Sequence, residues 1–214
     1  MKLVSVNVGT PREIEWNGKI LVTSIFKSPV DLRCKVSFTN IEGDEQSDLR
    51  VHGGVDKAIY SYDVEYYDYW KKQINRDDWN PGLFGENLTT KGMTDDIVRI
   101  GNIYKIGTIK ILAVQPRFPC LKLNAKFGMQ DMIERFYEQK RHGTYFRVIE
   151  EGYIETNNEI ELIEESPFNI SISDVTFCKV SKGADQGKLR EILEHPFIPD
   201  NLKEGLRGYL VVES

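Results

Sequence analysis

The stretch IVRIGNIYKIGTIKILAVQP, residues 97–116, decides the expected fold. Apolar residues recur at every second position, as at Ile109, Ile111 and Ala113, and this period of two is typical of β-strands. Glycines recur between the apolar runs, and β-branched residues are common. Short strands with close turns favour a closed or nearly closed β-barrel over a sheet with helical crossovers.

The same strand pattern occurs on both sides of this stretch. Gly, Pro and Asn residues separate the apolar runs, as expected for turns between strands. Further strands are predicted within residues 2–9, 19–27, 34–41 and 144–164.

Helical spacing predicts two helices, over residues 63–75 with Asp63 as N-cap and over residues 129–141. From Ile172 onward, apolar stripes broken by Gly and Pro predict short helices. The predicted fold class is mainly β (α+β). It consists of a β-barrel domain with flanking helices over residues 1–168 and a small helical C-terminal extension over residues 169–214.

Composition is that of a globular protein with a core. The chain has 214 residues, of which 40% are hydrophobic and 29% charged. No apolar run approaches the roughly 20 residues that a membrane span needs, and the N-terminus does not resemble a signal peptide. The three cysteines are far apart, which argues against a disulfide framework and favours a reducing, cytoplasmic location.

The net charge of −5 argues against nucleic acid as a partner. Residues 97–130 nevertheless contain no Asp or Glu. A positively charged segment of this kind attracts small anions and favours a thiolate over a thiol. Two of its lysines, Lys105 and Lys110, are more simply interpreted as surface residues of strands. Its six cations are Arg99, Lys105, Lys110, Arg117, Lys122 and Lys126.

The stretch PRFPCLKL, residues 116–123, lies within this segment. Pro119 removes a backbone donor and keeps Phe118 out of the helical region, so Cys120 is expected on a turn. Reactive and metal-ligating thiols occur at such places, whereas most intracellular cysteines are small buried hydrophobes. The stretch alone leaves both interpretations open.

Two other stretches contain candidate polar groups. In EGDEQSDLRVHGGVDKAIY, residues 42–60, His52 precedes two glycines that let backbone amides approach a ligand, and Lys57 follows. In FGENLTT, residues 84–90, Glu86 and Asn87 offer groups that suit the edge of a heterocycle. Taken alone, a histidine beside two glycines is more often part of a turn.

Several other chemistries lack their motifs. The sequence has no HExxH, CxxC, GxSxG or phosphate-binding P-loop, and no dinucleotide or iron–sulfur fingerprint. Its three histidines offer little for an all-His zinc site. Of these, His142 is expected as a cation at a helix end and His195 as a cap or surface residue. Redox chemistry would therefore need electrons from a partner.

Taken in order, the motifs VHGGVDKA, FGENL, VRIGNIYKIG and PRFPCLKL resemble the MOSC family, in particular its stand-alone, YiiM-like bacterial members. The resemblance runs from about Gly43 to Glu161. It implies a β-barrel that binds the molybdenum cofactor (Mo-molybdopterin), with the thiolate of Cys120 as a ligand to the metal. A soft sulfur ligand suits a metal that the pterin dithiolene already holds.

The resemblance also implies roles for the other candidates. Cys120 and His52 are predicted as catalytic residues, with His52 orienting cofactor or substrate. The predicted cofactor-binding residues are phosphate or pterin clamps and groups that hydrogen-bond the heterocycle. They are Lys57, Glu86, Asn87, Arg117, Cys120 and Lys122.

The implied function is an oxidoreductase that reduces small N-hydroxylated or N-oxygenated compounds of the hydroxylaminopurine or amidoxime type. Its electron donor would be a separate flavin or iron–sulfur reductase. No nucleic acid or membrane partner is expected. A homodimer is compatible with the sequence. The alternatives are a sulfur carrier with a Cys120 persulfide and a non-catalytic cofactor-binding module. A cysteine hydrolase with Cys120 activated by His52 is disfavoured, because it would leave Arg117 without a role.

Overall fold

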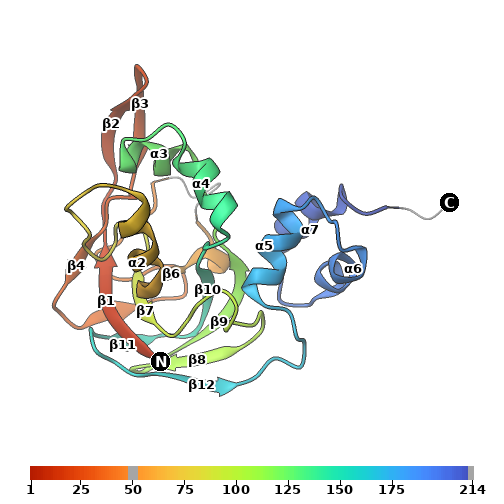
Figure 1. Cartoon of the computed structure of the whole chain (residues 1–214). Helices are drawn as coiled ribbons and strands as arrows, with labels where there is room; N and C mark the ends of the chain where they lie inside the picture. The colour runs from red at the N-terminus through yellow and green to blue at the C-terminus, as the bar shows by residue number, and fades with distance from the viewer. Residues whose placement is uncertain (48–52, 212–214) are drawn as a thin grey trace.

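The fold is built on one large mixed sheet. The computed structural model describes residues 1–47 and 53–211. Its eight-stranded sheet has the order β12-β8-β9-β10-β6-β7-β1-β4, and every neighbouring pair is antiparallel except the parallel pair β6 and β7 (Figure 1). The strands are β1 (Lys2–Val8), β4 (Ser28–Val30), β6 (Ile59–Asp63), β7 (Leu88–Lys91), β8 (Ile103–Ile106), β9 (Ile109–Pro116), β10 (Thr144–Glu150) and β12 (Ile160–Glu164).

The predicted mainly β, α+β class is confirmed, but the predicted closure into a barrel is not. Among the described residues, no strand ladder joins the edge strands β12 and β4. The start of β1 instead approaches β12 through one isolated bridge, between Lys2 and Glu159. Edge strand β4 has only three residues, and its Pro29 has no N–H to donate to a further strand.

A two-stranded hairpin of β2 (Arg12–Trp16) and β3 (Lys19–Thr23) projects from the body of the protein (Figure 1). Strand β2 was not predicted. Its turn, Asn17-Gly18, has positive φ angles of 53° and 72°, and Asn-Gly is the preferred pair for such a hairpin turn. A second small sheet pairs β5 (Cys34–Val36) with β11 (Gly152–Ile154).

Two of the helices that pack near the sheet were predicted, and a third was not. Helix α2 (Val64–Gln73) begins after Asp63, as predicted, and the Asp63 carboxylate accepts a hydrogen bond from the Glu65 N–H at 3.0 Å. Helix α4 (Met132–Gln139) lies inside its predicted range. Helix α3 (Leu121–Phe127) was not predicted, and it begins directly after Cys120.

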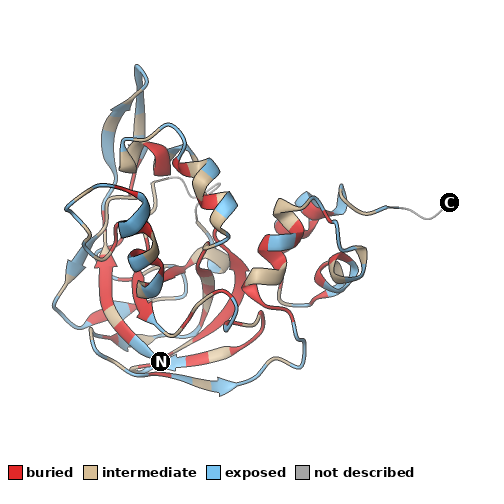
Figure 2. Cartoon of the chain, in the orientation of Figure 1, coloured by how far each residue is buried: buried red, intermediate tan, exposed pale blue. Residues whose placement is uncertain are grey.

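Buried side chains form two clusters, one inside the sheet and one, mainly aromatic, between the sheet and the helices. Figure 2 shows buried residues along the strands and on parts of the helices. In the aromatic cluster, the rings of Trp70 and Phe136 stack with centroids 6.0 Å apart, and the Trp70 indole N–H donates to the Tyr62 hydroxyl at 2.8 Å. This cluster fixes α2 and α4 against the strands that carry the site described below.

The C-terminal extension consists of α5 (Ile172–Val180), α6 (Gln186–Glu194) and α7 (Asp200–Arg207) and lies to one side of the sheet (Figure 1). A capping box of Ser171 and Asp174 begins α5. The apolar side chains of the extension belong to the same cluster as those of the sheet. Within the described residues, no helix is both long and apolar enough to cross a membrane.

The buried imidazole of His195 gives the stability of the protein a pH dependence. His195 is 1% exposed, and burial, with a smaller effect of Lys203, lowers its pKa to about 4. Of the two positions expected for it, the cap is confirmed, because His195 is the C-cap of α6, and the surface position is wrong. In the unfolded chain its pKa is about 6.5, so the unfolded chain takes up the proton first as the pH falls. The stability due to the neutral ring is full above pH 6.5 and is lost between pH 6.5 and 4.

The substitution His195→Asn tests this linkage. Asparagine keeps an acceptor for the Phe197 N–H, which lies 3.3 Å from Nδ1 of His195, but it does not titrate. When the pH falls from 7 to 4, we expect the unfolding free energy of the wild type to decrease by up to about 3 kcal/mol more than that of the variant. Urea denaturation at both pH values measures it. An equal difference at both would contradict the linkage.

Candidate functional site

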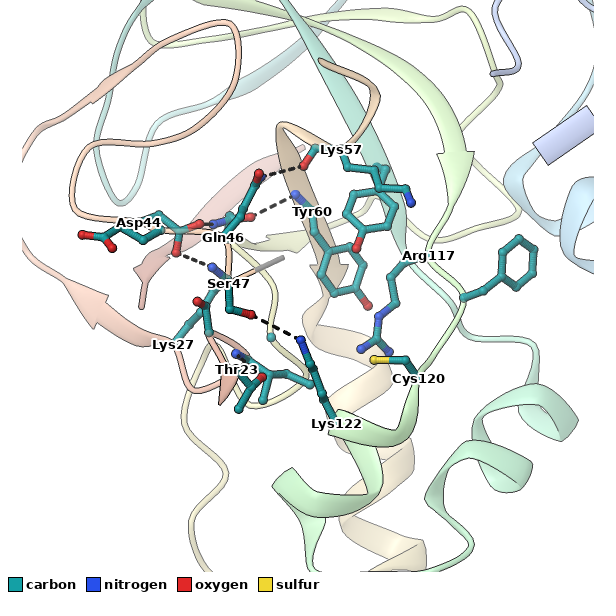
Figure 3. Close-up of a pocket in the computed structure, with 17 residues that line it drawn as sticks. Thr23, Lys27, Asp44, Gln46, Ser47, Lys57, Tyr60, Arg117, Cys120 and Lys122 are labelled. Atoms are coloured by element: carbon teal, nitrogen blue, oxygen red, sulfur yellow. Dashed lines mark hydrogen bonds and ion pairs between the residues drawn. The ribbon is translucent and has the colours of Figure 1, made fainter. Parts of the chain in front are cut away.

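A polar cavity opens where the end of β9 meets β6, β10 and the loop before β4. Its volume is about 640 Å³, including the solvent at its mouth. Cations, hydroxyl groups and one thiol share its wall (Figure 3). The lining residues are Thr23, Ser24, Ile25, Lys27, Asp44, Glu45, Gln46, Ser47, Lys57, Tyr60, Gly85, Asn87, Arg117, Phe118, Cys120, Lys122 and Tyr145.

Cys120 lies at the N-cap of α3 in an extended conformation and is half-buried. Pro119 before it prevents the helix from starting earlier. Figure 3 shows its sulfur beside the guanidinium of Arg117. A positive charge next to a partly accessible thiol favours the thiolate, the form that ligates metals and acts as a nucleophile. The predicted turn position of Cys120 at a cavity is thus observed.

Arg117 is buried, with 6% of its surface exposed. Its guanidinium carbon lies 5.5 Å from the ring centre of Tyr60 and 5.4 Å from that of Phe136. Among the described residues, no carboxylate forms an ion pair with it, and its Nη1 is buried without a hydrogen-bond partner. A buried guanidinium normally finds an anion. The side chain is therefore arranged for an anionic group in the cavity.

A second part of the wall is held together by Asp44. Its carboxylate forms an ion pair with the buried Lys27 and accepts hydrogen bonds from the Gly9 N–H at 2.8 Å and the Asn87 side-chain amide at 2.9 Å. The Asn87 amide oxygen accepts from the Tyr60 N–H at 3.2 Å. Asn87 thus uses its polar groups mainly to join the strands, and Lys27 adds a cation to the cavity. Burial lowers the pKa of Lys27, although Asp44 opposes this.

Two further cations complete the basic wall. Lys57 ends the short 3-10 helix η1 (Val55–Lys57), and burial lowers its pKa, although Asp56 opposes this. Lys122, in the first turn of α3, donates from Nζ to the Ser47 hydroxyl at 3.3 Å. With Lys27 and Arg117, the described part of the lining contains four cationic side chains and two carboxylates, those of Asp44 and Glu45.

The structure brings most of the predicted site residues together. Lys57, Asn87, Arg117, Cys120 and Lys122 all line this one cavity. Glu86 does not line it, because its side chain is turned into the interior. The prediction for His52 falls outside the described residues.

Sequence reasoning missed part of the cavity wall. Lys27 and Ser24 come from the loop after β3, and Ser24 Oγ is buried without a partner among the described residues. Tyr145 comes from β10 and Tyr60 from β6, which are neighbours in the sheet. No sequence motif marks these residues as part of a site. Only Lys27 has a notable position, next to Ser28 and Pro29 at the end of an apolar run.

The family can now be stated. The family model "MOSC domain" matches residues 48–161, more than half of the chain. The chain belongs to the MOSC domain family, and the predicted YiiM-like resemblance is confirmed.

Particular relatives define the class more closely. The chain is 38% identical to "Uncharacterized protein YflK" of Bacillus subtilis, over 79% of this chain and 76% of that protein. It is 31% identical to a protein named "Reductase" of Gibberella moniliformis, over 96% of this chain and 37% of that protein. The crystal structure of YiiM from Geobacillus stearothermophilus superposes with a TM-score of 0.82 at 31% identity, covering 98% of both chains. These similarities support a molybdenum-cofactor-related function.

The interior position of Glu86 predicts a structural role. Its carboxylate accepts hydrogen bonds from the N–H groups of Gly82 at 2.8 Å and Phe84 at 3.0 Å, and from the hydroxyls of Tyr67 and Thr89. We expect Glu86→Gln to lower the unfolding free energy by about 1–3 kcal/mol, because an amide N–H₂ would face a donor. Urea denaturation measures the loss. Unchanged stability with loss of cofactor would instead support the predicted cofactor contact.

Arg117, which has no carboxylate partner in the part of the chain that the structure describes, leads to the opposite prediction for stability. In protein without ligand, Arg117→Met removes a buried charge and keeps the length of the side chain. We expect the unfolding free energy to rise by about 1–3 kcal/mol. Urea denaturation of protein from a host that makes no molybdenum cofactor measures it.

The matched control is Arg147→Met. Arg147 forms an ion pair with Asp56 at the surface, with side chains 36% and 29% exposed. Its loss should lower stability by about 1 kcal/mol or less. A fall in stability for Arg117→Met larger than for Arg147→Met would show that the guanidinium is satisfied within the protein.

Proposed function

We propose that this protein is a molybdenum-cofactor-dependent oxidoreductase that reduces N-hydroxylated compounds. The observation that carries the proposal is the pairing of a half-buried thiol, Cys120, with a buried guanidinium, Arg117, that has no carboxylate partner among the described residues and whose Nη1 has no hydrogen-bond partner there. Together they suit a group that contains both a thiophilic metal and negative charge. Similarity to a protein named "Reductase" supports the reaction class.

The residues of the cavity fit such a group. Within the described part of the chain, no cluster of three or more His, Cys, Asp or Glu residues could hold a metal alone. A metal at Cys120 would need most of its ligands from an organic carrier, as the dithiolene of a pterin provides. The buried, unpartnered Ser24 Oγ and Arg117 Nη1 both belong to residues of the cavity wall and offer hydrogen bonds to that carrier.

Each part of the wall then has a task. The Cys120 thiolate would ligate the metal, and Arg117, Lys27 and Lys122 would balance the negative charge of the cofactor. Asn87, whose amide already links the strands, would shape the wall beside it. Lys57, whose pKa burial lowers, holds a proton at Nζ that it releases more readily than an exposed lysine would.

The bound cofactor supplies a centre that takes up oxygen and exchanges two electrons. In the overall reaction, an N-hydroxylated substrate takes up two electrons and two protons, its N–O bond breaks, and an amine and water are released. Groups of the cavity such as Lys57 Nζ supply protons. The electrons come from a separate flavin or iron–sulfur reductase, since the chain has no fingerprint for either carrier.

Metal content tests the proposal. Protein from a host that synthesises molybdenum cofactor should contain close to one molybdenum per chain by elemental analysis, and Cys120→Ser should lose most of it. The matched control is Cys34→Ala, because Cys34 is buried outside the cavity and its variant should keep the metal. The loaded wild type, with a chemical reductant, should convert an amidoxime or hydroxylaminopurine to its amine.

Other outcomes identify the alternatives. A mass gain of one sulfur on Cys120 without molybdenum would indicate a sulfur carrier. Stoichiometric molybdenum without turnover of any N-hydroxylated compound would indicate a non-catalytic cofactor-binding module. Either result would overturn the proposed reductase activity.

A further inference from the structure

The backbone of Arg117 is held from both sides by two consecutive residues. The Arg117 N–H donates to the Gly143 carbonyl at 3.2 Å, and the Arg117 carbonyl lies 2.9 Å from Nδ1 of His142. A carbonyl oxygen only accepts, so Nδ1 carries the proton and the imidazole donates. Both polar groups of the Arg117 backbone are therefore engaged by residues 142 and 143.

His142 and Gly143 are themselves fixed by one buried carboxylate. Asp95, 2% exposed, accepts from the His142 N–H at 2.8 Å with one oxygen and from the Gly143 N–H at 3.0 Å with the other. The Tyr66 hydroxyl donates to the same carboxylate at 3.0 Å. The Tyr60 hydroxyl donates to the His142 carbonyl at 2.9 Å. We call the chain of contacts Asp95, His142, Gly143 and Arg117 the Arg117 clamp.

Steric contacts leave little freedom in the clamp. Gly143 has φ +69°, and a Cβ there would lie 2.3 Å from the Ser61 carbonyl oxygen, so only glycine fits. The His142 ring is fully buried, and ring centres of Phe118 and Phe136 lie 5.4 Å and 5.2 Å from it. Burial lowers the pKa of His142 to about 4, so the ring is neutral at pH 7.

The clamp lies at the base of the loop that enters the cavity. Pro116 ends β9 opposite Thr144 of β10, and the four residues that follow carry both the guanidinium and the thiol. Among the described residues, His142 Nε2 has no hydrogen-bond partner. An unpaired buried nitrogen costs free energy. A histidine in this state is therefore expected where the hydrogen bond from its other nitrogen has a role in the structure.

We propose that His142 is a positioning residue for the site: its Nδ1–H donation to the Arg117 carbonyl, with the backbone of residue 142 fixed by Asp95, sets the place of Arg117 and Cys120 in the cavity. The inference rests on the proposed function, in which Arg117 and Cys120 bind the cofactor. His142 touches neither cavity nor ligand and acts through the loop.

The test compares three substitutions of His142 in protein from a host without molybdenum cofactor. Asparagine places an amide N–H₂ where Nδ1 lies, glutamine places it near Nε2, and leucine has no donor. The readout is the rate at which iodoacetamide alkylates Cys120 in the folded protein at pH 7, followed by mass spectrometry. The buried Cys34 and Cys178 report unfolding, because they should not react in the intact protein.

We expect His142→Asn to react within about twofold of the wild type, whereas His142→Gln and His142→Leu should react about fivefold more slowly. The thiolate attacks iodoacetamide and displaces iodide, and a displaced loop would separate the sulfur from the guanidinium that favours the thiolate. Loaded protein should show the same order in molybdenum content.

Two results would overturn the proposal. The first is a wild-type rate in His142→Gln and His142→Leu with Cys34 and Cys178 still protected. The second is an equal slowing in His142→Asn and His142→Gln, which would mean that the donor at Nδ1 does not matter. If His142→Leu does not fold, the comparison of asparagine with glutamine decides. Because alkylation is measured without cofactor, its result is independent of whether the protein is a molybdenum reductase.

Discussion

A guanidinium withdrawn from water without a carboxylate partner is the constraint on which the site depends. Among the described residues, Arg117 contacts the faces of Tyr60 and Phe136 and lies beside the Cys120 sulfur, but it pairs with no carboxylate. Contacts with aromatic faces are worth about 0.5–2 kcal/mol, which is less than the several kcal/mol that burial of a charge costs. A protein that keeps such an arginine gains from it only when an anion is bound. The anion-binding interpretation of the cavity follows from this imbalance.

The sheet provides the rigidity that this arrangement requires. Strands β9, β10 and β6 are consecutive neighbours in it; Tyr60 of β6 and Tyr145 of β10 line the cavity, and Arg117 directly follows β9. Asn87, at the start of the parallel neighbour β7, ties Tyr60 to Asp44. A side chain held by several strands loses little freedom when a ligand binds. The open sheet therefore positions the site without the predicted closed barrel.

The sequence predicts features that depend on neighbouring residues and fails where distant ones decide. The strand patterns located β1, β3, β8, β9, β10 and β12 but not β4 or the central strands β6 and β7, and Asp63 located the start of α2. Helix α3 was missed because Pro119 and Cys120 indicate a turn, and nothing local shows that the turn is an N-cap. Glu86 was assigned to the cavity, but Tyr67 and Thr89 draw its carboxylate inward. His142 was expected as a cation at a helix end, yet Asp95 holds its backbone in the core, where burial keeps the ring neutral.

The charge of the cavity illustrates the same limit. Residues 97–130 are rich in cations, but of these only Arg117 and Lys122 line the cavity. Lys105 is exposed on β8 and Lys110 forms a surface ion pair with Glu150, as expected for strand lysines. The remaining positive charge comes from Lys27 and Lys57, which lie far from this segment in the chain. The basic segment thus indicated the correct site, although the field there results from the fold joining three distant parts of an acidic chain.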